Sequence, residues 1–185
     1  MTHYQLGTDS EGFYAEFLTP LRGGTHKRDG SPDETEKIQG VNAQKLRHLE
    51  LLLIEPWNAE ISTRTGFPLT DAALVLVPNP VSFIVQKLLV YFDRKPEKRP
   101  GDLLYIHDTI VVFSPVLDDL AALWRSSVAP ALSSKGYREL TDNVSATVGA
   151  VTDTLRNAAR MVPTRRMDPE IMRRVCSEGL KRLLP

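Results

Sequence analysis

The strongest constraint on the fold is a stretch of two apolar segments joined by a short charged loop, residues 81–113. The first segment follows Pro80 and is apolar almost all round, with Lys87 among its few polar side chains. A helix of that composition has to be buried on most sides. The loop that follows, residues 93–101 (DRKPEKRPG), carries four cations and two prolines. The pattern predicts a buried helical hairpin with a basic loop at one end.

Charged side chains inside these apolar segments need partners. Burying an unpaired ammonium is costly, so Lys87 either binds a functional anion or reaches solvent or a structural salt bridge. Asp102 stands near the expected start of the second helix, where a carboxylate is stabilised by the helix dipole. It is therefore either a simple N-terminal cap or a functional acid. Asp108 lies further along the same apolar helix, and we expect Arg94, Lys98 or Lys87 to be its partner.

The other elements are predicted from alternation, helical periodicity and turn residues. Strands are expected near residues 13–19, 37–41, 57–63 and 73–77, the last of them buried, in one small mixed sheet. Further helices are expected at residues 43–54, 116–132 and 137–161, and from Pro169 onward. The prediction is an α+β protein, with a small mixed β-sheet followed by a helical C-terminal half. We expect an α+β region at residues 1–113 and a helical region at residues 114–185 packed on it.

Glu16 is the acid of the first expected strand, GFYAEFLT. Alternation places Tyr14, Glu16 and Leu18 on one face of that strand. Two interpretations stay open. Glu16 is either a solvent-facing carboxylate of an edge strand or a metal-binding or catalytic acid.

Composition excludes several classes of protein. The 185 residues include 23 basic and 23 acidic side chains, so any attraction to nucleic acid has to be local. Cys176 is the only cysteine, which excludes an internal disulfide and fits a reducing compartment. No apolar run has the length of about 20 residues that a membrane span needs. We expect a cytoplasmic protein with no membrane association. The C-terminal helices are rich in arginine and form either a nucleic-acid patch or a solvated face.

Several segments together resemble a known family. They are F-Y-A-E-F-L-T-P-L, G-V-N-A-Q-K-L, P-N-P with K-L-L, R-K-P-E-K-R and D-L-L-Y-I-H-D. The chain resembles the bacterial nucleotidyltransferases of the DNA polymerase β-like superfamily over roughly residues 12–124. The toxin-type and abortive-infection-type members are the nearest comparison.

The resemblance implies a partial nucleotidyltransferase fold and a set of roles. In that superfamily three carboxylates hold divalent metal ions, which clamp the triphosphate. Glu16 matches the third carboxylate and would bind Mg²⁺. Lys87, Asp102 and Asp108 would be catalytic, the two acids as a base or as structural partners. Arg94 and Lys98 would bind the nucleotide phosphates.

The sequence departs from the family pattern before Glu16. A Gly-Ser turn followed by D-x-D is expected there, and the fifteen preceding residues contain none. The chain therefore resembles the later two-thirds of such an enzyme, without two metal-binding carboxylates. The first hypothesis is the later part of a nucleotidyltransferase that moves a nucleoside monophosphate from an NTP to RNA, tRNA or protein. The second is an inactive module that binds nucleotide or nucleic acid. The third is a partner-binding protein, which pairs with the missing half or with an antitoxin.

Overall fold

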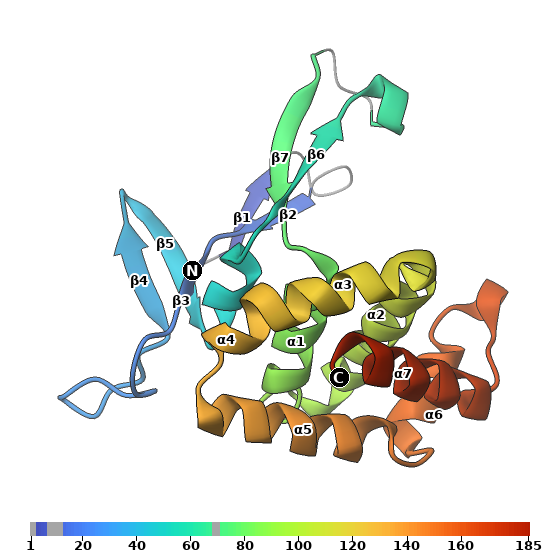
Figure 1. The fold of residues 1–185 in the computed structure, drawn as a ribbon. Helices are drawn as coiled ribbons and strands as arrows, with labels where there is room; N and C mark the ends of the chain where they lie inside the picture. Colours follow the sequence, from blue (N-terminus) through green and yellow to red (C-terminus); the bar gives the residue numbers. More distant parts are fainter. Residues whose placement is uncertain (1–2, 7–12, 68–70) are drawn as a thin grey trace. The chain divides into compact units, whose positions relative to one another are not determined.

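The structure is a computed structural model that describes residues 3–6, 13–67 and 71–185 (Figure 1). It confirms the predicted α+β class, with strands in the first part of the chain and mainly helices after Pro80. The chain forms two compact units, Met1–Glu50 and Leu51–Pro185. The expected division into residues 1–113 and a helical region packed on it, residues 114–185, stays a prediction.

The first unit contains two small sheets. Its strands are β1 (His3–Leu6), β2 (Phe13–Glu16), β3 (Leu18–Pro20), β4 (Thr35–Ile38) and β5 (Val41–Leu46). β1 pairs with β2, whereas β5 lies between β3, to which it is parallel, and β4, to which it is antiparallel. The single mixed sheet expected from the sequence is therefore wrong. The described strands of the whole chain form three separate sheets.

The helix expected at residues 43–54 is also wrong. Gln39 and Gly40 have φ angles of 49° and 86°, which make a two-residue hairpin turn between β4 and β5. This turn sets the register of β5, so Ala43 is buried as a strand residue. The leucines that follow form only a short 3₁₀ helix, Leu49–Leu53. The hydrogen-bonded ladder on both sides of β5 overrides the helical spacing of its apolar residues.

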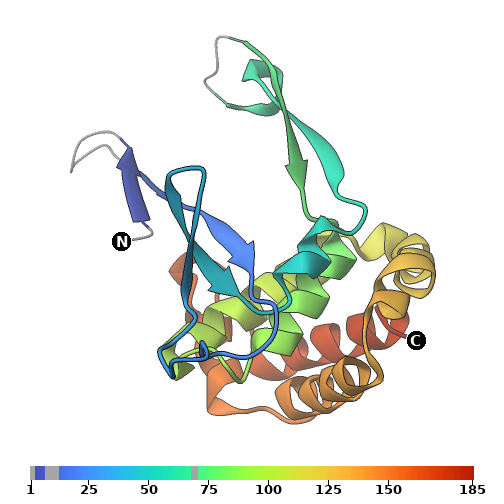
Figure 2. The same cartoon turned by 90° about the vertical axis from the view of Figure 1, so that its left-hand side faces the viewer.

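The second unit begins with an antiparallel hairpin and continues as a helical bundle (Figure 2). The hairpin consists of β6 (Trp57–Ile61) and β7 (Ala73–Val77). The helices are α1 (Pro80–Val90), α2 (Arg99–Val112), α3 (Leu117–Leu123), α4 (Ala129–Ala131), α5 (Ser134–Val148), α6 (Asp153–Arg160) and α7 (Pro169–Leu183). A π-helical turn, Trp124–Val128, joins α3 to α4. The predicted helix after Pro80 and the predicted last helix are both confirmed.

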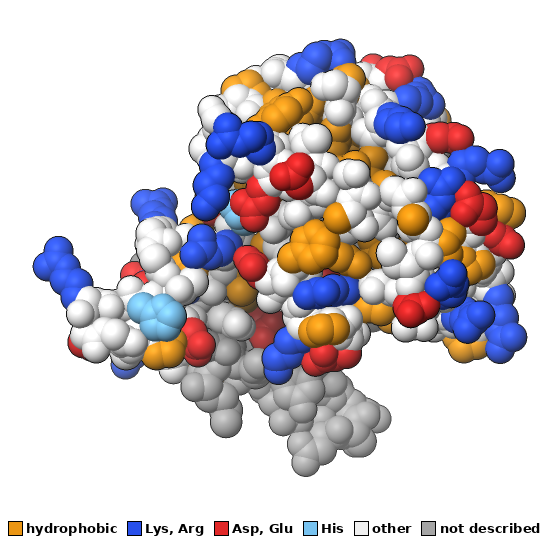
Figure 3. Space-filling model, turned by 90° about the horizontal axis from the view of Figure 1, so that it is seen from below, with side chains coloured by type: hydrophobic (Ala, Val, Ile, Leu, Met, Phe, Trp, Pro, Cys, Tyr) orange, Lys and Arg blue, Asp and Glu red, His pale blue; other side chains and the backbone are white. Residues whose placement is uncertain are grey.

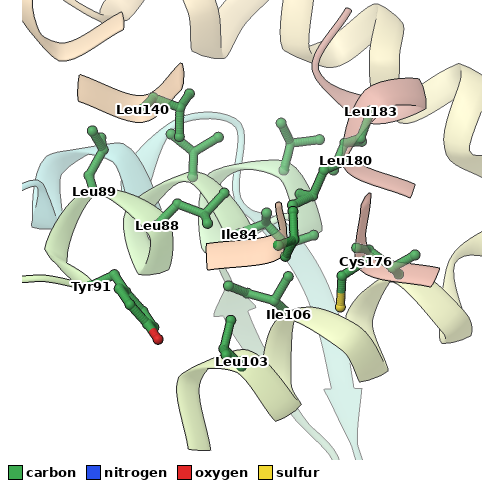
Figure 4. Close-up of a cluster of buried hydrophobic side chains, with 14 of the residues drawn as sticks. Ile84, Leu88, Leu89, Tyr91, Leu103, Ile106, Leu140, Cys176, Leu180 and Leu183 are labelled. Carbon is green, nitrogen blue, oxygen red and sulfur yellow. The ribbon is translucent and has the colours of Figure 1, made fainter. Parts of the chain in front are cut away.

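The buried hydrophobic cluster lies where α1 and α2 meet α5 and α7. Side chains from these four helices converge in Figure 4: Ile84, Leu88, Leu89, Leu103, Ile106, Leu140, Cys176, Leu180 and Leu183. All of these side chains are nearly inaccessible to solvent. Each fully buried leucine or isoleucine contributes about 1.5–3 kcal/mol to folding. Helix α1 is thus the central buried helix that the sequence predicts.

Two further expectations for this unit need correction. The helix expected at residues 137–161 is broken after α5, because the Thr152 hydroxyl accepts a hydrogen bond from Leu155 N and caps a separate helix, α6. Strand β7 is not buried. Leu74 and Leu76 are 74% and 67% exposed, because the described strands pair β7 with β6 alone.

Asn79 fixes the start of α1. Its buried side chain accepts a hydrogen bond from Ser82 N at 2.9 Å and donates to Ile54 O at 2.6 Å. We expect Asn79→Ala to lower the free energy of unfolding by about 2 kcal/mol, because it removes a cap and leaves a carbonyl without its partner. Ser133→Ala is the control, since Ser133 only caps the exposed start of α5. Equal losses for the two variants in chemical denaturation would contradict this account.

Candidate anion site at the end of the helical hairpin

A buried carboxylate organises the basic end of the α1–α2 hairpin. Asp102 lies in the first turn of α2, and its side chain is 1% exposed. Its Oδ1 accepts a hydrogen bond from Lys87 Nζ at 2.7 Å, and its Oδ2 accepts one from Arg94 Nε at 3.0 Å. Asp102 therefore ties α1, the basic loop and α2 together. Of the two alternatives for Lys87, the structure shows an ion pair with a carboxylate of the same chain.

The Lys87 ammonium is held on its other sides by aromatic rings. It lies 5.6 Å from the ring centroid of Phe83 and 5.5 Å from that of Tyr105, within the range of cation–π attraction. Phe83 is one turn before Lys87 on α1, and Tyr105 is one turn after Asp102 on α2. Helical spacing of four residues could have identified the contact of Lys87 with Phe83 from the sequence, whereas its contact with Tyr105 depends on how α1 and α2 pack.

The basic loop presents further cations to solvent. Arg94 binds Asp102 through Nε alone, and within the described residues its terminal guanidinium nitrogens have no hydrogen bond. Arg99 donates to the backbone carbonyls of Arg94 and Phe92, at 3.1 and 3.0 Å, and so holds the loop in shape. Lys98 is exposed and has no ion pair with any described residue. The loop therefore has hydrogen-bond donors that are available to bind an anion.

Asp108 belongs to a different cluster. Its Oδ2 accepts from an Arg165 terminal nitrogen at 2.7 Å and its Oδ1 lies 2.9 Å from His107 Nδ1. The expected partners Lys87, Arg94 and Lys98 are therefore wrong for Asp108. Partial burial opposes ionisation of this carboxyl, but the bonds from Arg165 and His107 outweigh it, so the pKa of Asp108 lies below its ordinary value.

The lowered pKa of Asp108 makes a prediction for acid unfolding. A carboxyl whose pKa is lower in the folded state stabilises the fold above its unfolded pKa, and this contribution is lost as the pH falls through the folded pKa. We expect Asp108→Asn to be less stable than wild type at pH 7. The difference should shrink below about pH 4. Urea unfolding of both proteins between pH 7 and pH 2 measures it, and a difference that grows in acid would contradict the sign.

The lone cysteine has no nucleophilic character. Cys176 is 1% exposed, and burial together with the nearby charge of Asp108 raises the pKa of its thiol to about 12. A thiol is a nucleophile only when deprotonated, so Cys176 is a core residue.

The described residues do not fit the magnesium site that the resemblance implies. Both carboxylate oxygens of Asp102 and of Asp108 are bound to cationic or imidazole nitrogens, and a metal ion at either carboxylate would have to displace these groups. In the described part of the chain, no three His, Cys, Asp or Glu side chains gather as a metal-binding group. Glu16 is exposed at the end of β2 in the first unit, and its metal-binding role stays a prediction.

Comparison with known proteins identifies the family. A family model described as Nucleotidyltransferase matches residues 2–129, more than half of the chain. The chain therefore belongs to this nucleotidyltransferase family. The match extends from the first strands through α1, the basic loop, α2 and α3, and α5 to α7 lie outside it. No curated protein and no solved structure gives a significant match.

Eight cations make the C-terminal end basic: Arg156, Arg160, Arg165, Arg166, Arg173, Arg174, Lys181 and Arg182. Half of them are paired with acids. Four ion pairs involve them: Arg156–Asp153, Arg165–Asp108, Arg173–Glu170 and Arg182–Asp118. In the face shown in Figure 3, Lys and Arg side chains are scattered with acidic and apolar side chains between them. This arrangement favours the solvated-face interpretation of that end.

Among the described helices, none is both long and apolar enough to span a membrane.

Proposed function

We propose that the basic end of the α1–α2 hairpin is the phosphate-facing side of the nucleotide site in this nucleotidyltransferase. Asp102 carries the proposal, because a buried carboxylate that holds Lys87 and Arg94 in place pre-organises two cations at one end of the hairpin. Lys98 adds a third, solvent-facing cation in the same loop. Counting Lys87 and all charged side chains of residues 93–102, five cations face three carboxylates, which leaves a net positive site suited to a triphosphate.

In the proposed reaction the chain transfers a nucleoside monophosphate from an NTP to RNA, tRNA or protein, as in the toxin or abortive-infection type of enzyme. Arg94 and Lys98 bind the phosphates and stabilise the charge of the departing pyrophosphate. Lys87 is enclosed by Asp102, Phe83 and Tyr105, and it would support the phosphates through its positive charge behind the two loop cations. The catalytic roles of Asp102 and Asp108 stay predictions, and the geometry of Asp102 favours positioning of the two cations. Glu16 would supply one carboxylate for the family's divalent ion, and the others would come from outside the described residues, for example from a partner protein.

Transfer of label tests this function. The protein is incubated with NTPs labelled at the α or the γ phosphate, with Mg²⁺ or Mn²⁺ and with tRNA, total RNA or no added acceptor. We expect α label, and no γ label, in RNA or in protein, because nucleotidyl transfer releases the β and γ phosphates as pyrophosphate. Transfer of γ label would show a kinase instead and would contradict the proposal.

The alternative is an inactive nucleotide-binding or partner-binding module. The described residues contain no group of three His, Cys, Asp or Glu side chains that could hold a metal ion, and this favours the inactive module. NTP binding that depends on Arg94 and Lys98, with no transfer of α label under any of these conditions, would support this alternative. Binding of RNA that weakens steeply with salt and needs only the C-terminal arginines would instead indicate a nucleic-acid module.

A further inference from the structure

A pocket of about 120 Å³ opens in the second unit between the π-helical turn, α5 and α7. Its apolar lining includes Trp124, Leu140, Leu180 and Leu184. An apolar protein cavity of about 150 Å³ accommodates a benzene molecule. The pocket is somewhat smaller but open to solvent, so a small ring or a short branched chain would occupy it with the rest of the ligand outside. None of its lining residues belongs to the anion site at the end of the α1–α2 hairpin.

The same pocket also carries polar groups that have capacity left for a ligand. Lys181 is exposed and has no ion pair with any described residue. The Tyr137 ring packs beside Trp124, with centroids 6.0 Å apart, and among the described residues its hydroxyl has no hydrogen-bond partner. The ammonium and the phenol can each donate a hydrogen bond to a negatively charged oxygen.

The backbone at this pocket is irregular. Trp124 is the first residue of the π-helical turn, whose hydrogen-bonding pattern differs from that of the α-helices on either side. Single π-helical turns occur frequently at functional sites, where they redirect a side chain. Trp124 is 2% exposed and lies beneath the pocket, so its fluorescence is expected to respond to a ligand bound above it.

We propose that this pocket binds a small carboxylic acid whose apolar body is about the size of one ring. The apolar body packs against Val144 and Leu184, the partly exposed apolar residues of the lining, and the carboxylate accepts hydrogen bonds from Lys181 Nζ and the Tyr137 hydroxyl. An isolated neutral hydrocarbon would leave the ammonium unused, and a small acid such as acetate would leave the apolar floor exposed. The apolar lining and the two polar groups, Lys181 and Tyr137, together therefore select an amphipathic anion.

Fluorescence of Trp124 tests the proposal. The Trp57→Phe protein retains Trp124 as its only tryptophan and is titrated with 3-phenylpropionate, with the uncharged 3-phenylpropionamide and with acetate. We expect saturable quenching or a spectral shift with 3-phenylpropionate, at least fivefold weaker binding of the amide, and no response to acetate. Equal affinities for the acid and the amide, or no response to 3-phenylpropionate at millimolar concentration, would overturn the proposal.

Two variants place the ligand in the pocket. Lys181→Met should lower the affinity for 3-phenylpropionate to that for the amide and leave the affinity for the amide unchanged, because it removes only the charge. Thr141→Phe should abolish binding of both, since the exposed side chain of Thr141 lines the pocket and a ring there would fill it. Lys135→Met, which changes another exposed lysine on α5, is the control and should bind like wild type. Acid binding that survives Thr141→Phe, in a protein whose unfolding midpoint is unchanged, places the ligand elsewhere and refutes the proposed site.

Discussion

Asp102→Ala is expected to lower the free energy of unfolding by about 3–5 kcal/mol, the cost of removing one partner from a buried ion pair. The variant leaves the Lys87 ammonium, whose side chain is only 15% exposed, beside two aromatic rings and without its anion. Arg94 contributes less to this cost, because its side chain is 40% exposed and can be solvated. Urea unfolding at pH 7 measures the loss.

Two controls distinguish the loss of this buried ion pair from the loss of any charged side chain. Asp153→Ala removes the acid of an exposed pair, since the Asp153 side chain is 93% exposed, and it should leave stability nearly unchanged. The double variant Lys87→Met with Asp102→Leu should be much more stable than Asp102→Ala, because replacing a buried ion pair with apolar side chains is often neutral. If the double variant is as unstable as Asp102→Ala, the unpaired ammonium is not the cause.

Gly179→Ala is the second substitution with a large expected effect. Gly179 is buried on α7, where a β-carbon would lie 2.3 Å from Cγ2 of Ile110 on α2. Neither helix can move without disturbing the shared core, so we expect a loss of about 3 kcal/mol, the upper end of the range for overpacking. This loss would exceed the gain of about 1 kcal/mol that alanine has over glycine in a helix. Thermal and chemical unfolding at matched pH measure it.

Gly136→Ala is the matched control for that substitution. A β-carbon at this helical glycine would lie 3.5 Å from its nearest neighbour, Ser133 Oγ, which is an ordinary contact. The variant should be as stable as wild type or more stable. In an Ile110→Ala background the cost of Gly179→Ala should fall, because the clashing methyl groups are gone. An equal cost in both backgrounds would show that the close approach of α2 and α7 is not responsible.

The helical hairpin was predictable because its signal is local. The almost wholly apolar segment after Pro80 can be stable only when surrounded, and α1 is the central buried helix of its unit. The need of Lys87 for a partner followed from the cost of burying an ammonium. The sequence left Asp102 open between a cap and a functional acid. Its buried position between Lys87 and Arg94 depends on how α1, the loop and α2 pack.

The errors arise where distant segments decide the outcome. Residues 43–54 have helical spacing, but β5 forms because the Gln39–Gly40 turn presents it to β4 and β3 pairs with its other edge. The partner of Asp108 is Arg165, which lies 57 residues away in sequence and follows a helix whose start the periodicity did not reveal. Neither pairing can be predicted from the local pattern of apolar residues.

Equilibrium binding of nucleotides tests the central claim, that the cations at the end of the hairpin face the phosphates of an NTP. The four NTPs and the four nucleosides are titrated calorimetrically into wild type, Arg94→Gln, Lys98→Gln and the control Lys135→Gln. We predict that at least one NTP binds more tightly than its nucleoside. Arg94→Gln and Lys98→Gln should each lower the affinity for that NTP about tenfold, the effect of losing one charged hydrogen bond. Lys135→Gln should bind like wild type. NTP binding that equals nucleoside binding, or that both loop variants leave unchanged, would contradict the claim.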